Sequence, residues 1–203
     1  MIESYLTISS ASEGFYKEKG SKFLAFAFPV ATEDEVRERL EDLRKRYHDA
    51  RHHCYAYILG AEKGSVRAND DGEPNHSAGD PILGQINSKH LTNVLVVVVR
   101  YFGGTKLGVS GLINAYKVSA EDALNNATIE KVYLTHCIRV DYPYESTNEV
   151  MRLINDFEIR VKDQVFEVAC ILKGEVKVTL VQALKEKVQL LKDTGHKLEL
   201  LVE

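Results

Sequence analysis

A glycine-rich turn that carries a lysine follows the most apolar segment of the sequence. Residues 94–99 are all apolar, rich in β-branching and too few to cross a membrane, so we expect a strand buried on both faces. Gly103, Gly104 and Lys106 come next, and a helical pattern begins near Gly108. Backbone N–H groups and a cation in front of a helix can bind an anion. The turn therefore indicates a phosphate, either of a nucleotide or of a nucleic-acid backbone.

This turn differs from the common phosphate-binding loops, and a second interpretation stays open. No hydroxyl residue follows Lys106, as a Walker loop requires, and the segment contains no Gly-x-Gly-x-x-Gly fingerprint. Gly103 and Gly104 could instead serve only to accept positive φ in a tight strand-to-helix turn. Either interpretation gives the same order of elements, a strand followed by a turn and a helix.

Several basic and polar residues are placed to share one surface with this turn. Arg100 ends the apolar strand, Asn114 and Lys117 follow on the helix, and Arg51 and His52 enter another strand. We expect these residues to form a local basic patch. The full set of candidates for binding a phosphate or a nucleic acid is Arg51, His52, Arg100, Gly103, Gly104, Lys106, Asn114 and Lys117.

A short acidic loop offers a second kind of chemistry. Residues 70–74 read Asp-Asp-Gly-Glu-Pro, so the loop is dense in carboxylates. Asp71 and Glu73 could hold Mg²⁺ or act as an acid/base pair, although the oxygen spacing of a calcium loop is missing. The alternative is a solvated turn whose shape is set by Gly72 and Pro74.

The histidine and cysteine residues form no recognisable metal motif. The three cysteines are widely spaced without a Cys-x-x-Cys pair, which favours reduced, mostly buried thiols. In the run His52, His53 and Cys54, alternation along a strand turns His53 away from its two neighbours. We expect packing roles there, no metal centre and no cofactor.

The composition is that of an ordinary globular protein. The 203 residues are 44% apolar and 28% charged, and the net charge is −4, so any contact with a nucleic acid must use a local patch. No segment approaches the roughly 20 apolar residues of a membrane span, and residues 1–10 lack the pattern of a signal peptide. We expect a cytoplasmic protein without a membrane partner. These features leave its oligomeric state open.

The elements that must position these residues fall into two groups along the chain. In the first group, residues 15–19 and 22–30 indicate a hairpin, and a capping box at residues 32–35 starts a helix. Residues 69–90 show little periodicity, so we expect a long functional or mobile loop. The other expected elements are a helix at 109–125 and strands at 53–60, 65–68, 94–101 and 129–134.

The second group has the order β-α-β-β-α-β, which is typical of a ferredoxin-like unit. A second capping box, at residues 146–149, opens its first helix, and Asp163 and Gln164 mark the turn of a hairpin. Its second helix stops near Gly195. The expected strands are 136–141, 157–161, 166–172 and 197–202. We place two domains at 1–134 and 135–203, with almost no linker between them.

Several blocks of the sequence resemble the IMPACT/YigZ-like family. The matching blocks cover most of residues 15–125, and they are 20–23, 52–56, 71–74, 78–83 and, above all, 93–108. The resemblance implies an α+β protein of two domains. The first would have the left-handed βαβ fold of a ribosomal small-subunit protein and of domain IV of elongation factor G. The second would be a ferredoxin-like domain similar to domain V of that factor.

The resemblance also implies a link to translation, because eukaryotic relatives regulate translation initiation. The leading hypothesis is a non-enzymatic regulatory or binding protein whose first domain contacts RNA, the ribosome or a translation-linked protein. An alternative is an enzyme that acts on a phosphorylated or nucleotide substrate, with Mg²⁺ held by Asp71 or Glu73. A further alternative is a protein-interaction module in which the ferredoxin-like half offers its sheet to a partner.

Overall fold

The chain forms two compact units, and together they make an α+β protein. The computed structural model describes residues 2–167 and 169–203; Met1 and Val168, the latter inside the predicted strand 166–172, lie outside the described residues. The first unit is Tyr5–Val132, and the second unit is Tyr133–Glu203 with the first residues of the chain. The division into domains at 1–134 and 135–203 stays a prediction.

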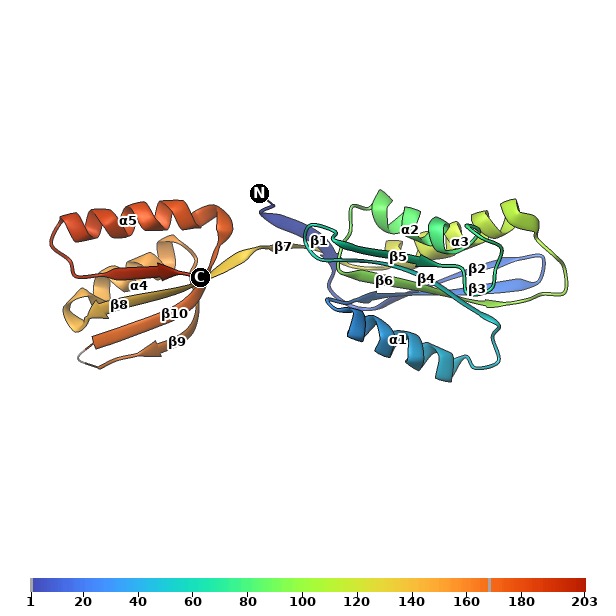
Figure 1. Cartoon of the computed structure of the whole chain (residues 1–203), viewed down its shortest axis with the longest axis horizontal. Coiled ribbons are helices and arrows are strands. Elements are labelled where there is room, and N and C mark those ends of the chain that lie inside the picture. The colour runs from blue at the N-terminus through green and yellow to red at the C-terminus, as the bar shows by residue number, and fades with distance from the viewer. Residues whose placement is uncertain (1, 168) are drawn as a thin grey trace. The chain divides into compact units, whose positions relative to one another are not determined.

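The first unit is built on a five-stranded sheet with the order β2-β3-β6-β4-β5. The central strand β6 pairs antiparallel with both β3 and β4. Helix α1 covers one face of this sheet, and α2 and α3 cover the other (Figure 1). The elements as far as residue 133 are β1 (Ser4–Ile8), β2 (Ser12–Glu18), β3 (Ser21–Pro29), α1 (Glu33–Arg46), β4 (His52–Leu59), β5 (Ser65–Asn69), α2 (Gly79–Ser88), β6 (Val94–Tyr101), α3 (Gly108–Asn125) and β7 (Ile129–Tyr133), with β1 and β7 pairing as a separate sheet.

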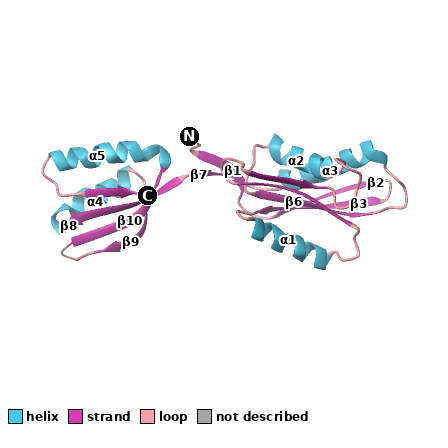
Figure 2. Cartoon of the chain, in the orientation of Figure 1, coloured by secondary structure: helices cyan, strands magenta, loops and turns pink. Residues whose placement is uncertain are grey.

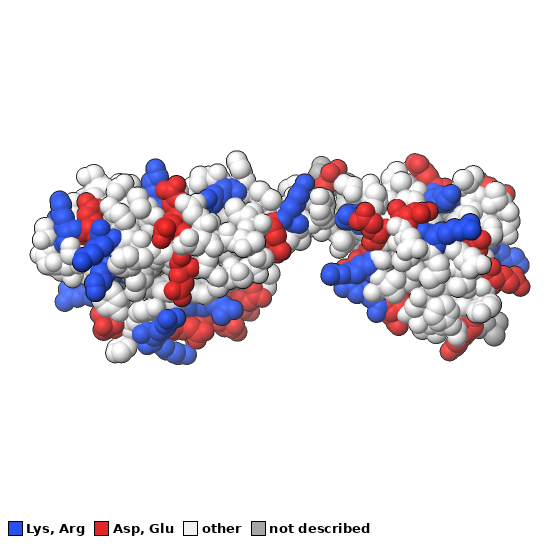
Figure 3. Space-filling view, turned by 180° about the vertical axis from the view of Figure 1, so that it is seen from behind, with Lys and Arg blue, Asp and Glu red and all other residues white. Residues whose placement is uncertain are grey.

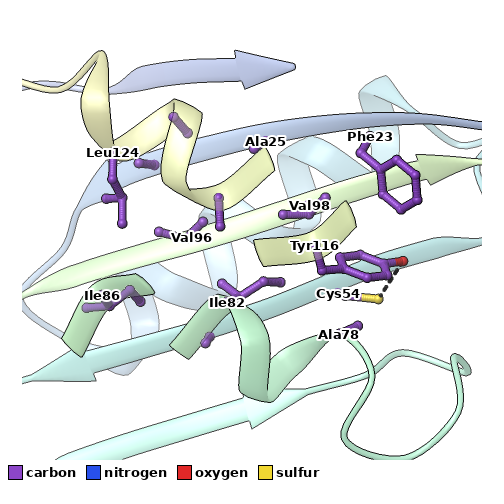
Figure 4. Packing of buried hydrophobic residues seen from close by; sticks show 14 of the residues in the cluster. Phe23, Ala25, Cys54, Ala78, Ile82, Ile86, Val96, Val98, Tyr116 and Leu124 are labelled. Atoms are coloured by element: carbon purple, nitrogen blue, oxygen red, sulfur yellow. Dashed lines mark hydrogen bonds between the residues drawn. The ribbon is translucent and has the colours of Figure 1, made fainter. Parts of the chain in front are cut away.

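Alternate side chains of β6 enter two different hydrophobic cores. Val96 and Val98 pack with residues of α2 and α3, part of which Figure 4 shows, whereas Val97 and Val99 pack with residues of α1. All residues from 94 to 99 have an exposed fraction of 0%. The prediction of a strand buried on both faces is therefore confirmed, and the period of two along the strand explains how one segment serves both cores.

Helix α1 begins at the predicted cap. The Thr32 hydroxyl accepts a hydrogen bond from the backbone N–H of Glu35 at 3.2 Å. The Glu35 carboxylate in turn accepts from the N–H of Ala31 at 2.6 Å, one residue earlier than a standard capping box requires. The apolar stripe of α1, with Leu40 and Leu43, is buried against the sheet.

The expectation that residues 69–90 form a loop without regular structure is wrong, because α2 lies inside this segment. The start of α2 is capped by Asp70, which precedes Ala78 by eight residues. The Asp70 carboxylate accepts hydrogen bonds from the N–H groups of Ala78 and Gly79 at 3.0 and 2.8 Å. Ile82 and Ile86, one helical turn apart, are fully buried. A helix with a distant cap and only a short apolar stripe leaves a weak periodic signal.

The second unit contains one antiparallel sheet with the order β11-β8-β10-β9, the arrangement of a ferredoxin-like unit (Figure 2). Its core joins the sheet to α4 and α5. The predicted order β-α-β-β-α-β is confirmed. The elements are β8 (Thr135–Pro143), the short 3₁₀ helix η1 (Tyr144–Ser146), α4 (Thr147–Asp156), β9 (Arg160–Val165), β10 (Ala169–Lys177), the 3₁₀ helix η2 (Val178–Leu180), α5 (Val181–Asp193) and β11 (Glu199–Val202).

Two local predictions in the second unit are wrong. The Ser146 side chain makes no capping hydrogen bond, because a 3₁₀ turn precedes α4 and Thr147 donates to the Tyr144 backbone oxygen at 2.5 Å instead. Asp163 and Gln164 are not at the hairpin turn but within β9, which lies at the edge of the sheet. Polar residues are ordinary on an edge strand facing water, so they did not mark a turn here.

None of the described helices is long and apolar enough to span a bilayer.

Candidate basic cleft

His52 and Arg100 are directly opposite each other on the neighbouring strands β4 and β6. Side chains alternate along a strand, so Arg100 projects to the same face as Val98, and His52 to the same face as Cys54. That face is the one covered by α2 and α3. The sheet register therefore brings together two predicted site residues that are far apart in the sequence.

A cleft of about 470 Å³ lies at this end of the sheet, beside the start of α3. Residues that precede β4, end β6 and lead into α3 meet there, together with part of the acidic loop. The lining residues are Arg51, His52, Glu73, Pro74, Arg100, Phe102, Lys106, Leu107, Gly108, Val109 and Leu112. The cleft thus combines basic groups with an apolar wall.

Arg100 is held rigidly in the cleft wall. Its guanidinium donates from Nη1 to the Glu73 carboxylate at 2.5 Å, and its Cζ lies 5.5 Å from the ring centre of Phe23 and 5.7 Å from that of Phe102. Both contacts are within the range of cation–π attraction. In the described part of the chain, the buried Nε of Arg100 has no hydrogen-bond partner. The wall of the cleft therefore contains a buried donor whose hydrogen-bonding capacity is not used.

Glu73 connects the cleft to the core. Its Oε1 also accepts a hydrogen bond from the Tyr116 hydroxyl at 2.8 Å, and the Cys54 thiol donates to that hydroxyl at 3.3 Å (Figure 4). Burial raises the pKa of the Cys54 thiol and of the Tyr116 hydroxyl above their ordinary values. A thiol in this state is not an activated nucleophile.

The other two acids of the loop are engaged inside the protein. Asp71 accepts from the backbone N–H of His53 at 2.6 Å, and His52 Nδ1 lies 2.8 Å from the Asp71 backbone oxygen and donates to it. Partial burial would raise the pKa of Asp70, but the backbone N–H groups of Gly79, His76 and Ala78 outweigh it and hold that pKa below its usual value. Among the described residues, no group of three or more His, Cys, Asp or Glu is placed to hold a metal ion.

The structure brings only some of the predicted site residues together. Arg51, His52, Arg100, Lys106 and Glu73 line the cleft. The predicted residues outside its lining are Asp71, Gly103, Gly104, Asn114 and Lys117.

Gly103 has a different reason for being glycine. A Cβ at this position would lie 1.9 Å from the backbone carbonyl carbon of Gly20, and the Gly103 N–H donates to the Ser21 hydroxyl at 3.1 Å. Gly104 has φ of +88°, which favours glycine. Gly104 therefore fits the positive φ that the alternative interpretation named, whereas Gly103 allows the close approach to the β2–β3 hairpin, which that interpretation did not include.

Asn114 and Lys117 are exposed on α3, outside the cleft. Asn114 lies close to the Tyr16 hydroxyl of β2. These two residues therefore extend the polar surface of α3 and do not contact the cleft.

His53 lies on the opposite face of β4, as alternation predicts. Desolvation by burial lowers the pKa of His53, and in the described chain its buried Nε2 has no hydrogen-bond partner. This neutral histidine packs near the end of α1 and takes no part in the cleft.

The sequence interpretation missed Phe102. Tyr101 and Phe102 lie between Arg100 and the glycine turn, and 55% of the Phe102 surface is exposed. An aromatic residue two positions after an arginine and four before a lysine is a signal for nucleic-acid binding that was available from the sequence. Tyr116 was also missed, because nothing in its helical pattern distinguishes a core tyrosine from one that holds a carboxylate.

Comparisons with a family model and with known proteins all identify the same family. The family model described as the Impact N-terminal domain matches residues 19–124. The chain is 32% identical to the Bacillus subtilis protein named "IMPACT family member YvyE" over 163 residues, which is 80% of this chain and 75% of that protein. It is 39% identical to a Dictyostelium discoideum protein named "Protein IMPACT homolog" over 95 residues, covering 45% of this chain and 27% of that protein.

A solved structure titled "Crystal structure of an hypothetical protein" is similar over the whole chain. The TM-score is 0.72 at 25% sequence identity, and the match covers 100% of this chain and 98% of the other. Both units described above therefore occur together in a second protein.

Proposed function

Because the chain belongs to the IMPACT family, we propose that it is a translation-linked binding protein whose first unit contacts RNA through the cleft around Arg100. The family membership supports the link to translation, since eukaryotic relatives are regulators of translation initiation. The cleft supports RNA as the partner. A ribosome-bound factor or another protein of translation is the outcome that the test below would reveal instead.

The observation that carries this proposal is the convergence of Arg51, Arg100 and Lys106 from three separate segments, with Glu73 as the one acid of the cleft lining. Glu73 already pairs with Arg100, so Arg51 and Lys106 supply the remaining positive charge. Basic side chains on the protein are gathered in groups between acidic ones, as Figure 3 shows for one face. On a chain with net charge −4, attraction to a polyanion must come from such local groups.

One observation favours a second candidate function. A volume of about 470 Å³ is in the range of sites that bind small molecules, and the lining is partly apolar. A phosphorylated small molecule or a nucleotide would fit such a site. The Mg²⁺-dependent version of this candidate loses support, because Asp71 and Glu73 make hydrogen bonds within the protein.

The test is cosedimentation of the purified protein with ribosomes and ribosomal subunits across a series of salt concentrations. Phosphate contacts make affinity fall steeply with salt, so we expect binding at low salt that is lost as salt rises and on nuclease treatment. Lys106→Glu should abolish it. Lys45→Glu is the matched control, because Lys45 is exposed on α1, over the opposite face of the sheet.

Binding that survives nuclease digestion of exposed RNA would identify a protein partner and overturn the RNA proposal. Absence of binding at the lowest salt, or equal loss in both lysine variants, would overturn it as well. Equal loss in both variants would mean that the cleft is not the interface. If no binding is seen, titration with nucleotides would test the second candidate.

A further inference from the structure

The cleft has an exposed apolar side that phosphate binding does not use. The exposed fraction is 55% for Phe102 and 53% for Val109, and Leu107 and Leu112 continue the same wall inward. Large apolar side chains that stay exposed inside a cleft mark a binding surface more often than a structural one. The ligand must therefore have a flat or apolar part as well as an anionic part.

We propose that the cleft accepts a single unpaired nucleotide of an RNA strand, with its base stacked on Phe102 and its phosphate bound by Arg51 and Lys106. This inference rests on the proposed RNA-binding function and specifies the form of RNA. The aromatic ring and the two cations line the same cleft, so one nucleotide can contact both.

Arg100 gives this site its rigidity. Its guanidinium is fixed between Phe23 and Phe102 and tied to Glu73, so the Phe102 ring is backed by a buried cation. The side chain of Arg100 is only 7% exposed, and its Nε is an unpaired buried donor. A buried donor without a partner is costly, so Arg100 is held in the wall by its contacts with Glu73 and the two rings.

The form of RNA follows from access to the base. In a duplex both faces of each base are covered by neighbouring bases, and the groove walls are lined by phosphates and hydroxyls. Only an unstacked base can lie against an aromatic side chain, and such stacking tolerates any sequence. A cleft of about 470 Å³ also has the size of a small-molecule site and not of a groove for a double helix.

The experiment compares the affinity of the full chain for a short unstructured RNA and for the same RNA annealed to its complement, by fluorescence anisotropy at low salt. We expect tighter binding of the single strand. Phe102→Ala should weaken that binding by about tenfold, the usual effect of losing one stacking contact. Phe102→Trp should preserve it, and binding to the duplex should not change in either variant.

Phe15→Ala is the matched control, because Phe15 is also an exposed aromatic residue of the first unit but lies on β2, outside the cleft. Its affinity for single-stranded RNA should equal that of the wild type. Thermal unfolding of each variant checks the fold, and little change is expected because both rings are half exposed.

The results separate the two proposals. Equal affinity for single strand and duplex, with Phe102→Ala unchanged and Lys106→Glu defective, would overturn the nucleotide site while the RNA-binding function stands. Failure of the wild type to bind either RNA would overturn both. Equal losses in Phe102→Ala and Phe15→Ala would also reject the site, since the effect would not belong to the cleft.

Discussion

Arg100 and Glu73 form an ion pair in which both side chains are almost completely buried, with exposed fractions of 7% and 4%. Removing two charges from water is costly, and their mutual attraction does little more than offset that cost. The pair is therefore better explained by the place in which it holds the Arg100 side chain than by a contribution to the stability of the fold. It fixes a guanidinium in the wall of the cleft, next to an exposed aromatic ring.

Neutralising Glu73 should destabilise the first unit. Glu73→Gln leaves the buried Arg100 without a counter-charge, and breaking one half of a buried pair costs about 3 kcal/mol. Urea unfolding at neutral pH measures this loss. Glu62→Gln changes an exposed carboxylate of the same unit and should leave the free energy of unfolding unchanged; equal effects of the two substitutions would show that the pair carries no special cost.

Asp70→Asn should reduce stability in a pH-dependent manner. The carboxylate accepts hydrogen bonds at the start of α2, and loss of a helix cap costs about 1 kcal/mol. The pKa of Asp70 is lowered in the folded protein, so its contribution is complete above the unfolded value of 3.8 and is lost as pH falls through the folded value. The difference in unfolding free energy from the wild type should thus be larger at neutral pH than in acid.

Asp42→Asn is the control for that experiment, since Asp42 is exposed on α1. A difference between Asp70→Asn and wild type that grew as the pH was lowered would contradict the assigned capping role.

The cysteines should differ in reactivity. Cys137 is exposed, whereas Cys54 and Cys170 are buried, and burial raises the pKa of the Cys54 thiol. Alkylation of the native protein, followed by mass spectrometry, should label Cys137 first and the other two only after unfolding. Raising the pH to 9 should not expose Cys54 to the reagent. Rapid labelling of Cys54 in the native protein would contradict its burial and the raised pKa of its thiol.

Alanine substitutions in the glycine turn should rank in a defined order. Gly103→Ala puts a Cβ against the backbone of Gly20 and forces the two segments apart, so we expect a loss of about 2 kcal/mol. A Cβ on Gly104 meets open space, and only its positive φ opposes the change, at about 1 kcal/mol. Urea unfolding of both variants tests the order. The reverse order would mean that the hairpin moves freely.

Local patterns in the sequence were sufficient for most elements of the fold. The apolar run at 94–99 predicts β6, because a strand buried on both faces needs no alternation of apolar and polar residues. Thr32 predicts the start of α1, because this capping residue directly precedes the helix in the sequence. Helix α2 was lost because its cap, Asp70, is supplied from a distance. A signal that depends on tertiary contact cannot be read from neighbouring residues.

In the candidate site, too, residues that are neighbours in the sequence could be predicted together, and relationships that depend on tertiary structure could not. Arg100 and Lys106 were identified because they belong to one continuous segment, and His52 was associated with them only as a residue of another strand. Its position opposite Arg100 depends on the register of β4 with β6, which the sequence does not display. Asn114 was assigned to the patch from helical spacing alone, but its contact with Tyr16 shows that this part of α3 faces β2.

The place of β6 between β3 and β4 has a consequence for the growing polypeptide. Strands β3 and β4 are both synthesised before β6, yet each pairs with β6 and neither pairs with the other. A nascent chain that ends before residue 94 thus holds two strands whose inner edges have no partner, and such edges attract chaperones and other chains. Closure of the sheet is a non-local event that waits for β6 to leave the ribosome. The cleft, which lies where that last strand ends, is completed only after the start of α3 has followed β6.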